Sequence, residues 1–360
     1  MTKQTIYLLI SHNDLGGAQK AQLKLAKTLS EKERDVKLIC LYSKSEGVPE
    51  YESIGGEYDK IKFYHYFLIF YKIFVFYIEK KPKIVISFLP LANLVNGFFG
   101  KIFSTKKRVI SHRNPIWTYN KLLILIDKIF GSIGMYTHVV GNSKAVAESY
   151  SQYGEKYNKI SHIINNSVIK IQPKKDYGQL CEEYNIDPNK KILLAVGRLS
   201  QQKRFDVIIK AIQGLENVQL IIAGEGELRD RLFSEVLSDM SVNFLGAIPH
   251  QEIIDLMYIC DLYLQPSEFE GQSNSLLEAI SCGAAVISSN IPPQVEVLLD
   301  DGVRCGEIVN DFEPTSWNRA IYKVLNSETI CHEFTEKALS RSLFFSPEKT
   351  ADKYIALVAK

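Results

Sequence analysis

Short apolar runs with the character of β-strands alternate with segments of helical periodicity along almost the whole chain. In the first half we predict strands at residues 5–10, 36–41, 84–87, 108–111, 138–141 and 159–164. In the second half the predicted strands span residues 192–196, 219–223, 242–245, 262–265, 285–288 and 307–309. Strands that alternate with helices form βαβ units, whose strands lie parallel in one sheet. Because 360 residues suffice for two domains, the sequence predicts an α/β protein with two Rossmann-like domains.

The composition changes in a polar stretch between residues 170 and 190, which contains two prolines and precedes a new buried strand. Polar, proline-containing segments are typical of domain boundaries. We therefore predict an N-terminal domain, a linker, a C-terminal domain and a final helix that crosses back to the N-terminal domain, over residues 1–168, 169–190, 191–345 and 346–360.

Charge is distributed unevenly, although the formal net charge of the chain is only +2. Residues 1–168 carry 24 Lys and Arg against 13 Asp and Glu, whereas the remaining residues carry 19 against 28. A basic half of this kind indicates an anionic partner, such as a membrane surface, phosphates or nucleic acid. The apolar and charged fractions, 46% and 23%, exclude a mainly disordered chain.

The six cysteines are scattered, with no C-x-x-C pair and no adjacent histidine cluster. This pattern argues against a zinc site or a disulfide framework and favours reduced thiols in a cytoplasmic protein. The first apolar run extends only from Ile6 to Ile10, which is too short for the core of a signal peptide. It predicts a first strand.

Three loops that follow predicted strands carry the residues suited to ligand binding, because ligands of doubly wound sheets bind at the carboxyl ends of the strands. The first loop ends in Gly16 and Gly17 and opens a helix. Paired glycines let a backbone approach a phosphate, although a tight turn explains them equally well. The loop is not G-x-G-x-x-G, so a dinucleotide fingerprint is absent. The second loop holds Arg198 and Lys203, which either converge on one anion or form a solvated basic loop.

The third loop runs from Pro266 into a helix that Ser273 or Asn274 caps. A capped helix start offers backbone amides to phosphate oxygens. Glu278 lies about one turn beyond the cap, where a carboxylate is suited to hold the two vicinal hydroxyls of a ribose. The alternative is that Glu278 only favours the helix dipole and that Glu270 is a loop charge.

The order of these motifs resembles glycosyltransferase family 4, the retaining "glycosyl transferases group 1" enzymes of the GT-B fold, and among them bacterial surface-polysaccharide and lipid-linked-glycan transferases. The matching motifs are G-G after the first strand, V-G-R-L-x-x-x-K, A-G-E-G-x-L and E-G-x-x-x-x-L-L-E-A-x-x-x-G-x-x-V-I-S. The resemblance covers nearly the whole chain and is strongest over residues 193–288. It implies two Rossmann-like domains whose parallel sheets face each other across a cleft.

The resemblance also implies roles for individual residues. Arg198 and Lys203 would bind the donor diphosphate, Glu270 the donor sugar and Glu278 the ribose hydroxyls. The remaining donor-binding positions that it implies are Gly16, Gly17, Ile248, Gly271, Asn274, Ser275 and Leu276. Ile248 lies in the segment that resembles the flank of the nucleobase, and the backbone amides near residues 274–276 would face the phosphates.

Two cleft-facing segments of the N-terminal domain resemble family motifs less closely. Residues 111–115 read S-H-R-N-P, and His112 or Arg113 would contact the donor sugar or an acceptor phosphate. A satisfied structural histidine explains His112 equally well. Asn142 is a second candidate for acceptor binding. The family's N-G-V appears here as Asn166-Ser167-Val168, and the turn after Gly271 reads Q-S-N-S, which leaves the donor sugar open.

The chemistry of sugar transfer from a nucleotide sugar fits these residues. Catalysis must stabilise the departing diphosphate, which cations and helix-terminal amides do. We assign catalytic roles to Glu270, Arg198, Lys203 and His112. No carboxylate pair demands a covalent nucleophile, and the resemblance implies retention by front-face attack. No D-x-D motif stands in the right place, and Asp300-Asp301 is interpreted as a loop. We therefore expect no cofactor and no essential metal.

Three basic-aromatic segments of the N-terminal half indicate what the acceptor is. The longest, residues 62–83, is too short and too interrupted by lysine to span a bilayer, and it is either an interfacial helix or a core helix. Residues 97–108 and 117–130 repeat its composition. We expect a peripheral enzyme on the cytoplasmic face of an anionic membrane. Its acceptor would be a polyprenyl-diphosphate-linked glycan of a capsule, O-antigen or similar polysaccharide, and we expect no nucleic acid partner.

The sequence thus predicts a hexosyl or N-acetylhexosaminyl transferase that uses a nucleotide sugar, with UDP as the expected carrier. One alternative is a nucleotide-sugar epimerase of the same architecture, for which no acid/base residues are identified. Another is an inactive membrane-associated subunit, against which the intact Arg198, Lys203, Glu270 and Glu278 argue. The missing glycine fingerprint disfavours an oxidoreductase.

Overall fold

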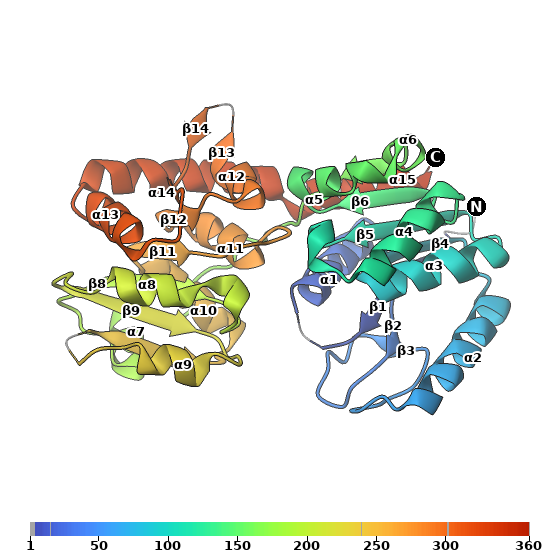
Figure 1. The fold of residues 1–360 in the computed structure, drawn as a ribbon, viewed down its shortest axis with the longest axis horizontal. Coiled ribbons are helices and arrows are strands. Elements are labelled where there is room, and N and C mark those ends of the chain that lie inside the picture. Colours follow the sequence, from blue (N-terminus) through green and yellow to red (C-terminus); the bar gives the residue numbers. More distant parts are fainter. Residues whose placement is uncertain (1–3, 15, 239, 301, 360) are drawn as a thin grey trace. The chain divides into compact units, whose positions relative to one another are not determined.

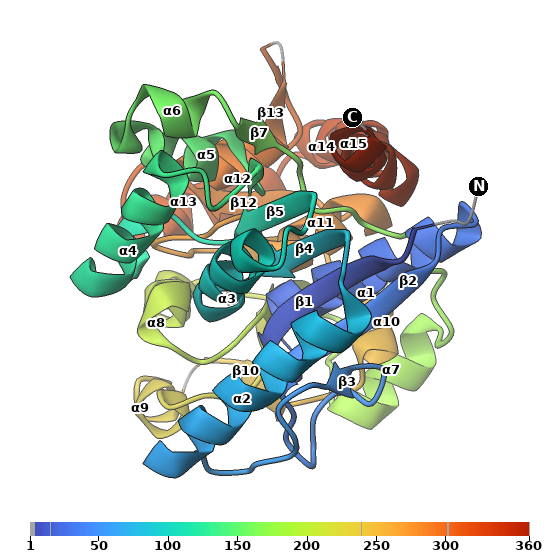
Figure 2. The same ribbon diagram turned by 90° about the vertical axis from the view of Figure 1, so that its right-hand side faces the viewer.

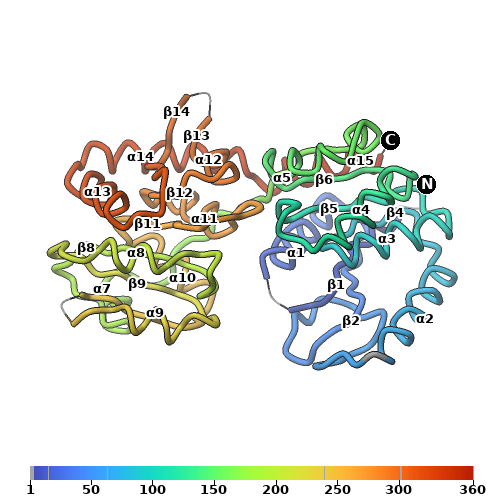
Figure 3. The backbone as a smooth tube through the Cα atoms, viewed as in Figure 1, coloured from blue at the N-terminus to red at the C-terminus, as the bar shows by residue number. Residues whose placement is uncertain are grey.

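The computed structural model describes residues 4–14, 16–238, 240–300 and 302–359, which form two compact α/β units (Figure 1). The first unit contains the chain up to Ser167 and again from Pro347, and the second unit is Val168–Ser346. The tube in Figure 3 follows the chain out of the first unit and back into it for the last helix, α15 (Pro347–Ala359).

The first unit contains a seven-stranded parallel sheet in the order β3-β2-β1-β4-β5-β6-β7. Its strands are β1 (Ile6–His12), β2 (Val36–Tyr42), β3 (Glu52–Ser53), β4 (Ile84–Phe88), β5 (Lys107–His112), β6 (His138–Gly141) and β7 (Ser161–Ile163). The central strands are buried on both faces, which is why their sequences are continuous apolar runs rather than alternating ones. Six of the seven strands were expected within one to two residues of these bounds. The seventh strand, β3, was not predicted, because its two residues are too few to show the pattern of apolar residues that marks a strand.

Helices cover both faces of this sheet. They are α1 (Gly17–Glu31), α2 (Phe63–Lys80), α3 (Pro90–Ile102), α4 (Lys121–Ser132), α5 (Lys144–Ser149), α6 (Glu155–Asn158) and α15. On one face α1 packs beside α15, whose Ala351 and Tyr354 share a core with Leu8 and Phe88. On the other face α2 and α3 lie over β1 and β4, as Figure 2 shows.

The second unit contains a six-stranded parallel sheet in the order β10-β9-β8-β11-β12-β15. Its strands are β8 (Lys191–Val196), β9 (Val218–Ala223), β10 (Val242–Gly246), β11 (Leu262–Gln265), β12 (Val286–Ser289) and β15 (Glu307–Val309). All six match the expected strands. A separate antiparallel hairpin pairs β13 (Leu299–Asp300) with β14 (Val303–Arg304). Asp300 is therefore a strand end rather than a loop residue, and Asp301 lies outside the described residues.

The helices of the second unit are α7 (Tyr177–Tyr184), α8 (Phe205–Ala211), α9 (Arg229–Ser234), α10 (His250–Ile259), α11 (Asn274–Cys282), α12 (Pro292–Leu298), α13 (Pro314–Leu325) and α14 (Glu328–Ser342). Helix α7 lies in the segment predicted to be a linker. Its Leu180 is fully buried, and Ile186 just beyond it packs in the same core as Val168. The segment 169–190 is thus part of the second unit, because a few apolar residues in a polar stretch suffice to anchor it.

Residues 62–83, for which the sequence predicted either an interfacial helix or a core helix, have features of both. The inward stripe of α2, Ile69, Ile73 and Tyr77, is buried against the sheet at a spacing of four residues. The outward side of the same helix leaves large aromatic side chains exposed. None of the described helices combines the length and apolar character needed to cross a membrane.

Candidate active site

The loop after β8 is shaped by two glycines at neighbouring strand ends. Gly197 has φ +154° and Gly224, which follows β9, has φ +143°. A Cβ on Gly224 would lie 1.9 Å from the carbonyl oxygen of Gly197, so only glycine allows the two backbones to approach this closely. The loop then forms a short 3₁₀ turn, Gln201–Lys203. Arg198 is exposed in this loop, and no ion pair links it to the described residues.

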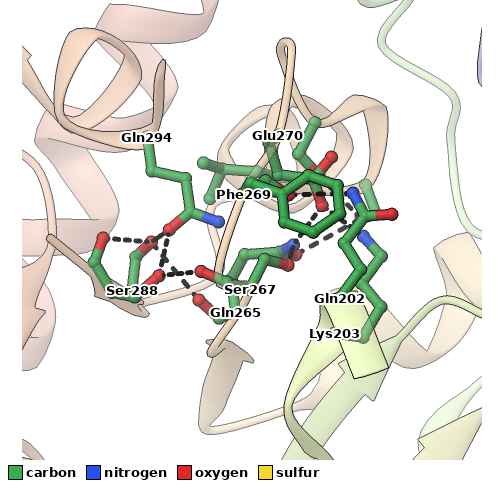
Figure 4. Close-up of polar contacts among 12 residues, drawn as sticks. Gln202, Lys203, Gln265, Ser267, Phe269, Glu270, Ser288 and Gln294 are labelled. Carbon is green, nitrogen blue, oxygen red and sulfur yellow. Dashed lines mark hydrogen bonds and ion pairs between the residues drawn. The ribbon is translucent and has the colours of Figure 1, made fainter. Parts of the chain in front are cut away.

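Lys203 joins this loop to the loop after β11. Its Nζ lies 2.7 Å from Oε1 of Glu270, and the side chains are only 14% and 11% exposed. Gln202 strengthens the connection, because its Nε2 donates to the carbonyl of Phe269 (2.8 Å) and its own carbonyl accepts from the amide of Glu268 (2.8 Å). Figure 4 shows Gln202 and Lys203 beside Phe269 and Glu270. Two residues singled out separately in the sequence, Lys203 and Glu270, therefore meet.

The start of α11 lies directly beyond Glu270. Ser273 is the N-cap and its Oγ accepts from the amide of Leu276 (3.3 Å), so of the two expected caps Ser273 is the one used. Asn274 is the first helical residue. The hydroxyl of Ser275 contacts Ser273 Oγ (3.1 Å) and Gln265 Oε1 (3.4 Å). Gly271 and Leu276 are buried, and Gly283 ends the helix with a left-handed conformation.

Glu278 is 96% buried on α11, and its Oε1 lies 3.1 Å from Nε2 of His250. His250 is the first residue of α10 and follows the turn that contains Ile248. Ile248 is half-buried and packs against the core of the second unit. The sequence analysis missed His250, because nothing local to residue 250 shows that a carboxylate 28 residues later lies beside it.

A buried polar cluster supports the loop of Glu270 from below (Figure 4). Gln265 Nε2 donates to Ser267 Oγ (2.8 Å), and Tyr263 donates its hydroxyl proton to Gln265 Oε1 (2.9 Å). Ser289 Oγ lies 2.5 Å from the carbonyl oxygen of Ser267 and 2.8 Å from Oε1 of Gln294, and its one hydroxyl proton is donated to either of these two acceptors. These bonds join the ends of β11 and β12 to the start of α12, although the buried Nε2 of Gln294 has no hydrogen-bond partner among the described residues. Sequence reasoning did not find this cluster, because Gln and Ser at strand ends have no distinctive spacing.

Gly16 and Gly17 lie in the first unit. Gly16 is the N-cap of α1 and Gly17 its first residue, and Leu15 before them is outside the described residues. The glycine pair thus begins a helix at the carboxyl end of β1, which both interpretations of the sequence require.

His112 ends β5 and is held inside the first unit. Its Nε2 lies 2.6 Å from the hydroxyl of Tyr157 and 3.4 Å from Asp127 Oδ2, and its ring stacks on Tyr150 with the centroids 3.8 Å apart. Burial lowers the pKa of His112, so the ring is neutral near pH 7. These contacts are those of a satisfied structural histidine. The catalytic role assigned to it gains no support from this geometry.

Arg113 is buried beside the end of β7. It donates to Oδ1 of Asn166 and, at 3.5 Å, to Ser111 Oγ, and its guanidinium lies 4.7 Å from the ring centroid of Phe88. Within the described residues no carboxylate forms an ion pair with it. Asn142 is also buried and donates to the carbonyl of Arg113 (3.4 Å). These two candidates for acceptor binding therefore lie together at the carboxyl edge of the first sheet.

The described residues contain no group of three or more His, Cys, Asp and Glu that could hold a metal ion. The six cysteines are all free thiols. That the reaction needs no metal stays a prediction, which activity assays with a chelator would test.

Comparisons with known proteins agree with this architecture. Residues 178–341 match the family described as "Glycosyl transferases group 1". An uncharacterized glycosyltransferase of Methanocaldococcus jannaschii is 28% identical over 297 residues, which are 77% of this chain and 73% of that protein. The N-acetylgalactosamine-N,N'-diacetylbacillosaminyl-diphospho-undecaprenol 4-alpha-N-acetylgalactosaminyltransferase of Campylobacter jejuni is 26% identical over 266 residues, 71% of this chain and 70% of that one.

Among solved structures, HepE of Anabaena in complex with UDP and glucose is similar over 99% of both chains, with a TM-score of 0.81 and 16% identity. At this identity the likeness concerns the fold, which is GT-B. The matched segment, the two parallel sheets and the related enzymes lead to one conclusion: this chain is a glycosyltransferase with the GT-B fold that resembles bacterial polysaccharide transferases, and its residues 178–341 match the group 1 glycosyl transferases.

Proposed function

We propose that this enzyme transfers a hexose or N-acetylhexosamine, with retention, from a UDP-sugar to a polyprenyl-diphosphate-linked glycan. The observation that carries the proposal is the meeting of Lys203, Glu270 and the start of α11 at the carboxyl edge of the second sheet. Ligands of doubly wound sheets bind at this edge. The UDP complex of HepE and the undecaprenol-linked acceptor in the name of the Campylobacter enzyme support the choice of donor and acceptor.

The donor diphosphate would bind between Arg198, Lys203 and the N-terminus of α11. The first amides of a helix have no partners inside the helix and carry the positive end of its dipole, which suits phosphate oxygens. Arg198 is exposed and therefore reaches a ligand without breaking an ion pair with any described residue. As the sugar departs, negative charge grows on the diphosphate, and these fixed positive groups stabilise it.

Glu270 would accept hydrogen bonds from the donor sugar. Its bond to Lys203 and the support of Gln265, whose Nε2 lies 3.5 Å from Oε1, hold the carboxylate in place before the sugar arrives. Retention would follow from attack of the acceptor hydroxyl on the face from which the diphosphate leaves. The departing phosphate then takes the hydroxyl proton, so no protein carboxylate is needed as nucleophile.

The first unit supplies a surface suited to a membrane-bound acceptor. Helices α2, α3 and α4 are neighbours and leave many large apolar side chains exposed: Tyr64, Tyr66, Phe67, Leu68, Phe70, Tyr71, Phe74, Ile78, Leu91, Phe98, Ile102, Leu122, Leu125 and Ile129. We call this set the aromatic face. The three helices also carry five lysines, and Glu79 is their only exposed acidic residue.

Exposed apolar patches of this extent mark interaction sites, and lysines around them favour an anionic bilayer as the partner. The aromatic face would then lie in the membrane interface on the cytoplasmic side, where lipid-linked acceptors of a capsule or O-antigen are extended. This placement would bring the acceptor diphosphate within reach of the basic first unit.

A transfer assay tests the proposed reaction. The purified protein is incubated with single nucleotide sugars and synthetic undecaprenyl-diphosphate-linked mono- and disaccharides in anionic vesicles, and lipid products are separated by chromatography. One UDP-sugar should give a product with an α-linkage, and Glu270→Gln should abolish it. Product from none of the nucleotide sugars with wild type, despite measurable UDP binding, would contradict the proposed acceptor. A product with inverted configuration would contradict retention.

A further inference from the structure

The bond between His250 and Glu278 has no explanation in the local structure of either helix. His250 stands at the first position of α10, after the N-cap Pro249, which makes no side-chain capping hydrogen bond. Helix α10 is instead anchored by Ile254, Leu256 and Met257, which are buried in the core. Stability of α10 therefore does not require a histidine at residue 250.

Glu278, in contrast, needs a partner. A carboxylate that is 96% buried is costly unless hydrogen bonds compensate for the loss of water. His250 supplies one at 3.1 Å, and its own side chain is 35% exposed, so the imidazole reaches from the surface to the buried carboxylate. The pair is carried by two adjacent helices, α10 and α11, which are packed against each other. Its geometry is thereby fixed by the core.

A carboxylate offers about four lone-pair positions and can therefore accept from several donors at once. His250 is one such donor, placed 3.1 Å from Oε1. The position of a hydrogen-bond donor favours one orientation of the carboxylate plane, because the donor must lie near a lone pair of a carboxylate oxygen. Histidine at this place thus orients Glu278 toward whatever binds at the carboxyl edge of β10 and β11.

We infer that His250 is a positioning residue for nucleotide recognition: it holds Glu278 in the orientation that accepts the two ribose hydroxyls of the donor. This inference rests on the proposed function, in which Glu278 binds ribose. It assigns His250 no direct contact with the reacting atoms. Under this inference, the preference for a ribonucleotide over a nucleotide without ribose hydroxyls depends on both His250 and Glu278, and not on Glu278 alone.

Calorimetric titration with UDP and with 2′,3′-dideoxyuridine diphosphate tests the inference. We expect His250→Ala to raise the Kd for UDP about tenfold, as loss of a hydrogen bond to a charged group does. The Kd for the dideoxy nucleotide should change less than twofold, because this nucleotide has no ribose hydroxyl that could donate a hydrogen bond to Glu278. His332→Ala, at an exposed histidine of α14, is the matched control and should change neither Kd.

Conservative variants separate positioning from a general role in folding. The amide nitrogen of glutamine reaches about as far from the backbone as Nε2 of histidine, whereas that of asparagine does not. His250→Gln should therefore restore the UDP Kd to within about threefold of wild type, and His250→Asn should resemble His250→Ala. In steady-state assays His250→Ala should raise KM for the donor and leave kcat nearly unchanged.

The outcomes also distinguish this inference from the function on which it rests. If Glu278→Gln weakens UDP binding but His250→Ala does not, the inference is wrong and the ribose role of Glu278 stands. If His250→Ala weakens both nucleotides equally, His250 acts on the fold of the site and the inference is wrong. If wild type binds no UDP, the proposed donor falls, and the inference falls with it.

Discussion

Lys203 and Glu270 form an ion pair across two loops, with Nζ 2.7 Å from Oε1, although 67 residues separate them in the chain. The pair ties the turn after β8 to the turn after β11. It also balances the charges of two groups that we propose to contact different parts of the donor. A diphosphate that binds Lys203 must either share it with Glu270 or displace it.

Removal of either basic residue of the β8 loop should affect turnover more than binding. Arg198→Ala and Lys203→Ala should each lower kcat about 10²-fold, in the range seen when one transition-state donor is lost. The UDP Kd should rise less. Lys203→Arg should restore little activity, because the planar guanidinium of arginine does not place its charge where the compact ammonium of lysine does. Steady-state kinetics and UDP titration measure both quantities, and near-normal turnover in both Ala variants would remove this loop from the active site.

The same two variants should differ in stability. Arg198 is exposed, so its removal should leave the free energy of unfolding unchanged. Lys203→Ala leaves the nearly buried Glu270 carboxylate without its cation, which should cost about 1–3 kcal/mol. Urea denaturation compares the two, with Arg319→Ala on the exposed side of α13 as a control.

Glu278→Gln should weaken donor binding without unfolding the protein. Hydrogen bonds to a charged acceptor contribute roughly 1.5–3 kcal/mol, so the apparent donor constant should rise about tenfold or more. Titrations with UDP and with the UDP-sugar check the effect. Unchanged affinity for both ligands would mean that Glu278 only favours the start of α11.

Membrane binding should depend on both charge and the aromatic face. Each lysine near an anionic surface contributes about 1 kcal/mol, which salt screens. Replacement of Lys80, Lys81 and Lys83 by Glu should release the protein from anionic vesicles in flotation assays, as should high salt. Replacing Phe70 and Phe74 by Ser should weaken binding even at low salt. Equal partition of wild type to neutral and anionic vesicles would contradict the proposal.

His112 should make the first unit less stable in acid. Burial lowers its pKa in the folded state below the usual 6.5. As pH falls below about 6.5 the unfolded chain takes up a proton that the folded chain does not, so stability falls with pH at up to about 1.4 kcal/mol per pH unit. His138, whose pKa burial lowers to about 4, adds to the same trend.

Substitution separates the two histidines. His112→Gln should reduce, but not remove, the loss of stability between pH 7 and pH 5, because His138 still titrates. Urea unfolding at the two pH values measures the difference. An unaltered pH dependence in His112→Gln would show that the pKa of His112 is the same in the folded and the unfolded chain, which contradicts the prediction.

Gly224→Ala should damage the β8 loop from a distance. The new methyl group would meet the carbonyl oxygen of Gly197 at 1.9 Å, and φ +143° is a conformation that L residues rarely adopt. The two strand ends must separate, which moves Arg198 and Lys203. We expect lower stability and at least a tenfold loss of activity, measured by thermal melts and the transfer assay. Gly302→Ala, where the added Cβ meets nothing within 4 Å, is the control for backbone strain alone.

The sequence alone determined the elements and the chemistry of the loops between them. Buried parallel strands such as β1 and β8 are continuous apolar runs, and this signal is local, so twelve strands were predicted close to their observed bounds. The motifs around Arg198, Lys203, Glu270 and Glu278 were equally visible, because each one lies within a single loop and the helix that follows it.

Tertiary structure alone decided which side chains meet. The partner of Glu270 lies 67 residues away and that of Glu278 lies 28 residues away, and no local period encodes such pairs. His112 became a core residue because Tyr150 and Tyr157, from later segments, enclose it. The inward and outward sides of α2 were likewise assigned only when Ile69 and Tyr77 packed on the sheet, since an aromatic helix shows no polar side from which its orientation can be predicted.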